Sequence, residues 1–136
     1  MTAWRWVQRQ PWLYLWLPLG IWMGLIFCLS ARPDLPYPKS GWAALLLSSG
    51  AHVILFGVLA VLWARALGER SRGWFIALVL TLLYALSDEF HQVFVPNRHA
   101  DPLDLLCDAL GAALGLGVWT RLRHCSTGLR QSRLRG

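Results

Sequence analysis

Four long apolar stretches dominate the pattern of hydrophobic and polar positions along the chain. They run over residues 11–29, 42–67, 74–95 and 102–120. A helix rises about 1.5 Å per residue, so about 20 residues cross the hydrocarbon core of a bilayer, and each stretch is of that length. The pattern predicts an all-α fold, an integral membrane bundle of four transmembrane helices.

The connections between these stretches are polar or rich in proline. Residues 30–41 contain three prolines and several charges, and residues 68–73 are short and basic. Such segments are typical of loops and turns outside the membrane. The first apolar stretch is longer than the core of a secretory signal peptide, so we expect it to stay in the protein as a helix.

The composition supports a membrane protein and excludes several other classes. The chain is 56% hydrophobic and 15% charged, with a mean hydropathy of +0.43 and nine tryptophans, which favour the interface between bilayer and water. The three cysteines show neither zinc-ligand spacing nor an even disulfide set. A water-soluble domain, a disordered chain and a disulfide scaffold are therefore not expected.

The placement of the basic residues predicts the orientation. The net charge is +6. On one side of the four spans lie ten basic residues: Arg5, Arg9, Arg65, Arg70, Arg72, Arg121, Arg123, Arg130, Arg133 and Arg135. The other side holds only Arg32, Lys39 and Arg98. Because basic residues accumulate on the cytoplasmic side, we expect both termini in the cytoplasm.

This placement also predicts domains and partners. We divide the chain into a four-helix transmembrane domain, residues 1–120, and a basic, disordered cytoplasmic tail, residues 121–136. The basic tail of a membrane protein is more often attracted to anionic lipid than to nucleic acid. We therefore expect the lipid bilayer as a partner and no nucleic acid, and oligomerisation is left open.

Acidic residues gather around the third and fourth spans. Five of the seven carboxylates lie between residues 88 and 108. Three of them, Asp88, Glu89 and Asp108, fall inside apolar stretches, where an ionisable group costs about 2.5 kcal/mol or more. Such groups usually face the interior of a bundle or a wet cavity and mark a functional site.

Helical spacing indicates which groups share a face. Asp88 shares a face with His91 and Gln92, whereas Glu89 lies about 100° further round the helix. On the fourth span one stripe contains Asp101, Asp104, Asp108, Gly111 and Gly115. The glycine pair permits close helix packing, although Gly20 and Gly24 form a similar pair. Asp101 also fits an N-cap before Pro102, and Asp104 fits a first-turn acid that complements the helix dipole.

Three polar residues on three spans lie at a common depth. Counted from the basic end of each span, His52, Asp88 and Asp108 are 13, 15 and 13 residues deep. These counts correspond to about 20, 22 and 20 Å. A lone histidine on an apolar helix is more often a satisfied core residue, but acids at the same level give it partners. The sequence therefore predicts one shared polar site below the outer surface.

Two motifs resemble the VanZ-like family of small bacterial integral membrane proteins. One is DEFHQVFVPNR over residues 88–98, followed by DLLCDALG over residues 104–111, and the other is His52 with Phe56 and Leu59. The resemblance covers roughly residues 12–120 and implies a multi-pass protein of the bacterial plasma (inner) membrane. It also implies a link to low-level resistance to the glycopeptide antibiotic teicoplanin, with no settled reaction.

The chain departs from the family pattern at two places. Family members often carry an Asp-Lys pair shortly before the histidine, where this chain has Ser48 and Ser49. A mechanism that needs that lysine is therefore in doubt here. Many relatives have glycine after the proline, where this chain has Asn97, which also tolerates a left-handed turn.

Three hypotheses follow for the site. In the first, the protein acts on or binds a lipid-linked or cell-envelope head group; in the second, it is a proton- or ion-coupled transporter; in the third, the polar groups are structural and function lies in partner binding. The candidate catalytic residues are Asp88, Glu89, His52 and Asp108. The candidate ligand-binding residues are His91, Gln92, Arg98, Asp101 and Asp104. Carboxylates at this site could bind a divalent cation, but the sequence names no metal or cofactor.

The charge asymmetry yields a test of topology. Reporter fusions at Lys39 and Arg98 should report an extracytoplasmic location, and fusions at Arg72 and Gly136 a cytoplasmic one. Paired phosphatase and fluorescent-protein fusions measure this directly. A cytoplasmic location for Arg98 would contradict the predicted site below the outer surface.

Overall fold

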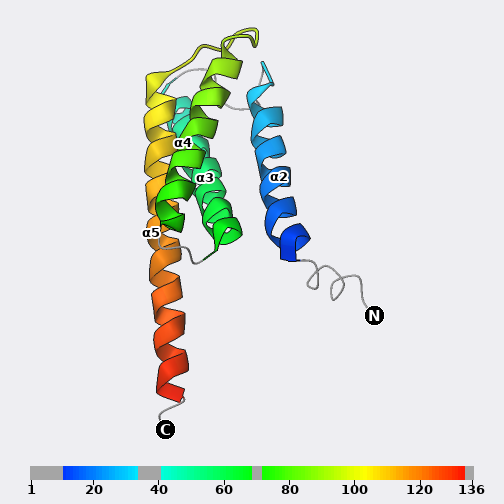
Figure 1. Cartoon of the computed structure of the whole chain (residues 1–136). Coiled ribbons are helices and arrows are strands. Elements are labelled where there is room, and N and C mark those ends of the chain that lie inside the picture. Colours follow the sequence, from blue (N-terminus) through cyan, green and yellow to red (C-terminus); the bar gives the residue numbers. More distant parts are fainter. Residues whose placement is uncertain (1–10, 34–40, 69–71, 134–136) are drawn as a thin grey trace, which may run out of the picture.

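The computed structural model describes residues 11–33, 41–68 and 72–133 as an up-and-down set of long helices (Figure 1). The helices are α2 (Pro11–Ser30), α3 (Trp42–Leu67), α4 (Gly73–Gln92) and α5 (Pro102–Arg133). Each contains a span long and apolar enough to cross a membrane. The expected all-α fold with four such helices is therefore confirmed for the described residues.

The helices present large apolar side chains outward on every side. Ile21 of α2, Ile54 of α3, Phe90 of α4 and Leu114 of α5 are each more than half exposed. A surface of this kind is stable in contact with lipid acyl chains, because a bilayer is as apolar as the side chains themselves. The apolar exterior is consistent with a multi-pass membrane protein.

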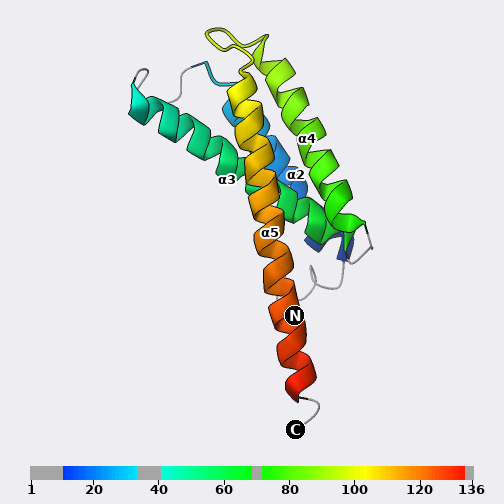
Figure 2. The same cartoon turned by 90° about the vertical axis from the view of Figure 1, so that its left-hand side faces the viewer.

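Glycines bring the backbones of α3 and α5 into direct contact at the point where the two helices cross (Figure 2). A Cβ atom on Gly111 would overlap the backbone carbonyl of Val53, and one on Gly115 would overlap that of Gly57. Small residues allow such crossings within membranes, where packing stabilises helix pairs. The similar pair Gly20 and Gly24 has open space at both positions, so it packs against no described residue.

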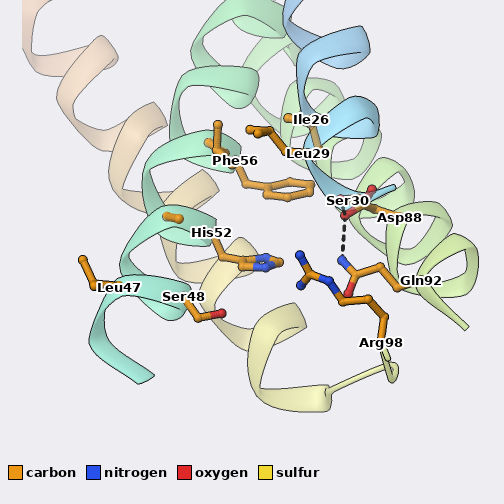
Figure 3. Close-up of a pocket in the computed structure, with 12 residues that line it drawn as sticks. Ile26, Leu29, Ser30, Leu47, Ser48, His52, Phe56, Asp88, Gln92 and Arg98 are labelled. Atoms are coloured by element: carbon orange, nitrogen blue, oxygen red, sulfur yellow. Dashed lines mark hydrogen bonds between the residues drawn. The ribbon is translucent and has the colours of Figure 1, made fainter. Parts of the chain in front are cut away.

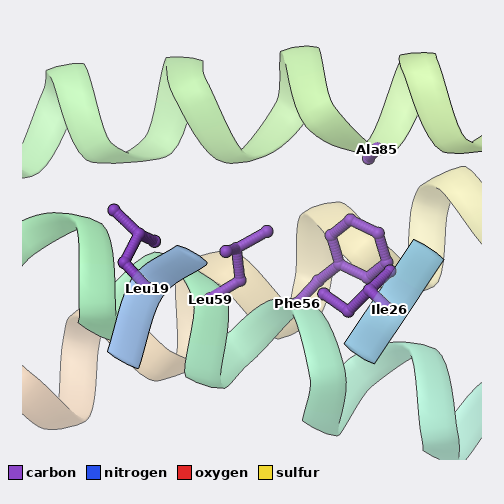
Figure 4. Packing of buried hydrophobic residues seen from close by; sticks show 5 residues of the cluster. All are labelled: Leu19, Ile26, Phe56, Leu59 and Ala85. Carbon is purple, nitrogen blue, oxygen red and sulfur yellow. The ribbon is translucent and has the colours of Figure 1, made fainter. Parts of the chain in front are cut away.

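A second contact ties α2 to α3 and α4. Leu19, Ile26, Phe56, Leu59 and Ala85 form one buried apolar cluster (Figure 4). Two interhelical hydrogen bonds flank it: the Trp22 indole N–H donates to the Leu55 carbonyl at 2.9 Å, and the Tyr84 hydroxyl donates to the Met23 carbonyl at 2.7 Å. Away from water these polar groups must find protein partners, so the bonds fix how α2 sits on the other helices.

The connection between α4 and α5 is a compact turn. The third apolar stretch extends to residue 95, but α4 ends at Gln92 because Pro96 and Asn97 follow. Asn97 adopts a left-handed backbone with φ of 62°, as its place in the family motif suggests. Asp101 caps α5 by accepting a hydrogen bond from the Leu103 amide at 2.9 Å.

Helix α5 continues well past the fourth apolar stretch. We expected a disordered tail over residues 121–136, but the helix runs on to Arg133, and residues 134–136 lie outside the described part. Adding residues to an existing helix avoids the cost of nucleation, and the arginines and leucines of this segment are good helix formers. The start of α2 and the end of α5 lie at the same end of the bundle, opposite the turn between α4 and α5 (Figure 1).

The crossing of α3 and α5 gives a stability prediction. Replacing Gly111 with Leu should cost about 3 kcal/mol or more, because the obstacle is the backbone of α3 and not a movable side chain. Gly117→Leu is the matched control, since that glycine lies on the same helix with open space around it. Thermal unfolding in detergent should show a large loss of stability for Gly111→Leu only. Equal stability of the two variants would contradict the close packing.

Candidate functional site

Buried polar side chains collect near the end of the bundle where α4 turns into α5. Thr81 is the exception, and its hydroxyl is satisfied by the Ala77 carbonyl of its own helix at 2.8 Å. The other buried polar residues of the described chain come from all four helices: Ser30, His52, Asp88, Glu89, Gln92 and Asp108. The structure therefore brings polar groups from distant parts of the sequence to one level.

The His52–Asp108 pair joins α3 to α5. The His52 Nδ1 atom lies 2.9 Å from Asp108 Oδ1, and its Nε2 atom lies 3.5 Å from Asp104 Oδ2. The imidazole is parallel to the ring of Phe56. His52 precedes Val53, whose backbone meets Gly111, and Asp108 lies one turn before Gly111. The glycine crossing thus places the two side chains opposite each other, as their common depth predicts.

Glu89 extends this pair to a third helix. One ligand atom each from His52, Glu89 and Asp108 lies within 4.8 Å of the other two, and we call this group the His-Glu-Asp cluster. The Glu89 Oε2 atom accepts a hydrogen bond from the Asp101 amide at 2.8 Å. The cluster therefore joins α3, α4 and α5 on the interior of the bundle.

Asp88 belongs to a different set of contacts. Its Oδ2 atom accepts hydrogen bonds from the Ser30 hydroxyl at 2.6 Å and from the Gln92 amide at 3.2 Å. Neighbouring residues point about 100° apart on a helix, so Asp88 faces α2 while Glu89 contacts the start of α5. Sequence analysis placed Ser30 in a loop and missed this role. The only signal was its position at the end of the first span, level with the turn after α4.

A cavity of about 210 Å³ lies beside these groups, between α2, α3 and the end of α4. Its apolar wall includes Ile26, Leu29 and Phe56, and its polar residues are Ser30, Ser48, His52, Asp88, Gln92 and Arg98. Figure 3 shows the Arg98 guanidinium reaching toward His52 and Gln92. His52 borders both the cavity and the His-Glu-Asp cluster, so the two are adjacent.

Arg98 lines the cavity, and within the described part of the chain it has no ion-pair partner. Its Nε atom donates to the Arg32 carbonyl at 3.4 Å, and no described carboxylate lies within ion-pair distance of its guanidinium. The structure therefore does not show the direct counter-charge to Asp88 that a purely structural polar core would need. Ser48 also lines the cavity.

The remaining predicted site residues lie at the edges. His91 stacks on Phe27 with ring centroids 4.5 Å apart and does not line the cavity. Asp101 is exposed and caps α5, which is the alternative its spacing suggested. Asp104 is half-buried, with its carboxylate near the far nitrogen of His52. The spacing of residues along one helix shows which of them share a face. It does not show how their side chains point relative to the neighbouring helices.

The arrangement combines three chemical capabilities. An imidazole held by a carboxylate can accept or release a proton. A nitrogen and two carboxylates on separate helices are ligand types that suit a metal ion. A guanidinium beside hydroxyl and amide groups suits a phosphate or carboxylate.

Comparison with known proteins identifies the family. The family model VanZ/LLP1 matches residues 9–123, a range that contains the His-Glu-Asp cluster and the cavity. No curated protein and no solved structure matches the chain. The match extends over most of the sequence and agrees with the resemblance carried by the motifs at residues 88–98 and 104–111. The chain therefore belongs to the VanZ/LLP1 family, as a membrane protein with a buried polar cluster of histidine, glutamate and aspartate.

Proposed function

We propose that this protein binds the anionic head group of a lipid-linked or cell-envelope molecule in the cavity, at the outer face of a bacterial plasma membrane. The observation that carries the proposal is Arg98, a guanidinium directed into a partly apolar cavity, with no carboxylate of the described residues paired to it. Arginine binds phosphate and carboxylate groups through a fork of parallel N–H donors.

The orientation predicted from the basic residues supports an outer-face site. The three basic residues assigned to the outer side include Arg32 and Arg98, which lie near each other at the cavity end of the bundle. The cavity is thus on the side of the membrane where lipid-linked envelope precursors are used. The family resemblance to a protein of glycopeptide resistance is in line with a ligand of this kind.

The shape of the cavity supports a ligand with an apolar part. Leu47 and Ala51 line it and are also exposed on the surface of α3, within a membrane span. A lipid could therefore enter sideways from the bilayer, with its chain against Ile26 and Leu29 and its head group beside Arg98. Apolar walls with a few placed polar groups are typical of small-molecule sites.

The polar residues take distinct roles in this proposal. Arg98, Gln92 and Ser48 bind the head group, and Asp88 accepts a hydrogen bond from a hydroxyl of the ligand. His52, held by Asp108, borders the cavity beside a bound head group. His91, Asp101 and Asp104 do not line the cavity, and we assign them supporting roles.

A proton- or ion-coupled transporter has less support. Beyond the polar end, the buried residues between the helices include Leu19, Leu59, Ala60, Ala64 and Leu116, which offer no side chain for relaying a proton or ion. Thr81 interrupts this apolar region but donates its hydroxyl to its own helix. Transport would need a polar path through the whole bundle.

The proposal predicts a specific loss of bound lipid. The wild type, purified in mild detergent from cell membranes, should retain an anionic lipid or lipid-linked precursor that native mass spectrometry detects. Arg98→Gln should reduce this retention by about 10-fold or more, because a hydrogen bond to a charged group contributes about 1.5–3 kcal/mol. Arg32→Gln is the matched control, since its side chain is exposed and only its backbone carbonyl meets Arg98. Equal retention of the lipid by all three proteins would contradict the proposal.

Asp88→Asn separates function from packing. The Asn side-chain oxygen can still accept hydrogen bonds from Ser30 and Gln92, and no buried cation loses its partner. The free energy of unfolding should therefore change by about 1 kcal/mol or less, while head-group binding and any glycopeptide-tolerance phenotype are lost. Thermal unfolding and lipid retention, measured on the same sample, check both parts. A destabilisation as large as that of Gly111→Leu would assign Asp88 to the structural core instead.

A further inference from the structure

Two carboxylate oxygens of the His-Glu-Asp cluster are buried with no hydrogen-bond partner. They are Oε1 of Glu89 and Oδ2 of Asp108, and the two side chains belong to residues that are 7% and 1% exposed. A buried carboxylate oxygen without a partner is costly, because it has lost its hydration and gained nothing in exchange. Each unpartnered oxygen in a native structure therefore calls for a ligand that satisfies it.

A proton on Glu89 would itself need a hydrogen-bond acceptor. Its Oε2 atom already accepts a hydrogen bond from the Asp101 amide, so the proton of a neutral carboxyl group would sit on Oε1. A cation, in contrast, needs a lone pair and no acceptor.

The charge balance also favours a cation. The carboxylates of Glu89, Asp104 and Asp108 surround the single imidazole of His52, and no described arginine forms an ion pair with them. Buried charges in a membrane are stable only when they are paired or ligate an ion. A divalent ion would offset two of these carboxylates at once.

We propose that His52, Glu89 and Asp108 form a binding site for a divalent transition-metal ion, with Zn²⁺ as the ion that fits these ligands. Zinc takes histidine nitrogens and carboxylate oxygens at about 2.0–2.2 Å, which puts the ligand atoms of a tetrahedral site about 3.4 Å apart. One ligand atom each of His52, Glu89 and Asp108 lies within 4.8 Å of the other two, so small side-chain movements bring all three to this spacing. Mg²⁺ and Ca²⁺ prefer sites made only of oxygen ligands.

The site has room for a fourth ligand. Three protein ligands leave one position of a tetrahedral ion open, as is usual in zinc sites that act on a ligand. Since His52 borders both the cluster and the cavity, a ligand in the cavity would lie next to a metal ion in the cluster. The inference that an oxygen of the head group takes it rests on the proposed function, whereas the metal site itself does not.

Metal content tests the proposal directly. The wild type, purified in detergent with a tag free of histidine, stripped with chelator, incubated with ZnCl₂ and desalted, should hold about one zinc per chain by inductively coupled plasma mass spectrometry. Glu89→Gln and Asp108→Asn should each lower zinc content by about 10-fold. Asp88→Asn is the matched control, because it makes the same change at the adjacent residue, and it should keep its zinc.

Thermal unfolding provides a second readout, for which the wild type alone is sufficient. Zinc that binds only the folded protein should raise the Tm of the stripped wild type by several degrees, and MgCl₂ at the same concentration should not. The Tm of Glu89→Gln should not respond to zinc. If Glu89→Gln and Asp108→Asn do not fold, the wild type decides alone, and a Tm unchanged by zinc overturns the metal site.

The results also separate the two proposals. Zinc retained equally by Glu89→Gln, Asp108→Asn and the wild type overturns the metal site, as does an equal rise of the wild-type Tm with zinc and with magnesium. Arg98→Gln should keep its zinc while losing its lipid. A wild type that holds zinc but no lipid contradicts the head-group proposal only, and one that holds lipid but no zinc contradicts the metal site only.

Discussion

The backbone contact between α3 and α5 is the constraint on which the site depends. Gly57, Gly111 and Gly115 let two helices approach more closely than any side chain would permit. Packing is the main attraction between helices in lipid, so this contact stabilises the pair and also sets the register between the two. With the register fixed, His52 and Asp108 meet at 2.9 Å. A rotation of either helix would separate these two side chains.

Helix α4 contributes two adjacent acids with different surroundings. Asp88 faces α2, and its Oδ2 atom accepts hydrogen bonds from Ser30 of α2 and from Gln92 of its own helix. Glu89 contacts the start of α5 and keeps one oxygen without a partner. The carboxylate of Asp88, at the cavity, thus has hydrogen-bond partners, whereas the carboxylate of Glu89, in the cluster, has one oxygen without a described partner. This difference is why we assign the first to ligand recognition and the second to a metal ion.

The cavity and the cluster share His52 and so form one site with two parts. The cavity offers apolar surface and the guanidinium of Arg98, which together suit a lipid with an anionic head group. The cluster offers an excess of negative charge, which suits a cation. Opposite charges placed side by side in a dry interior can hold an anionic ligand and a cation in contact, because each offsets the cost of burying the other.

The sequence by itself determined the four spans, because a bilayer requires about 20 apolar residues per crossing. It also determined the common depth of His52 and Asp108, because the rise per residue of a helix converts residue number into height. Tertiary structure alone decided that Ser30 bonds to Asp88, that His91 turns aside onto Phe27, that α5 extends to Arg133, and that a cavity forms beside the cluster. The spacing of polar residues shows which of them share a helix face, but it does not show how that helix is rotated relative to its neighbours. That rotation is set by close contacts between helices, and those contacts choose which of the polar groups at one depth come together.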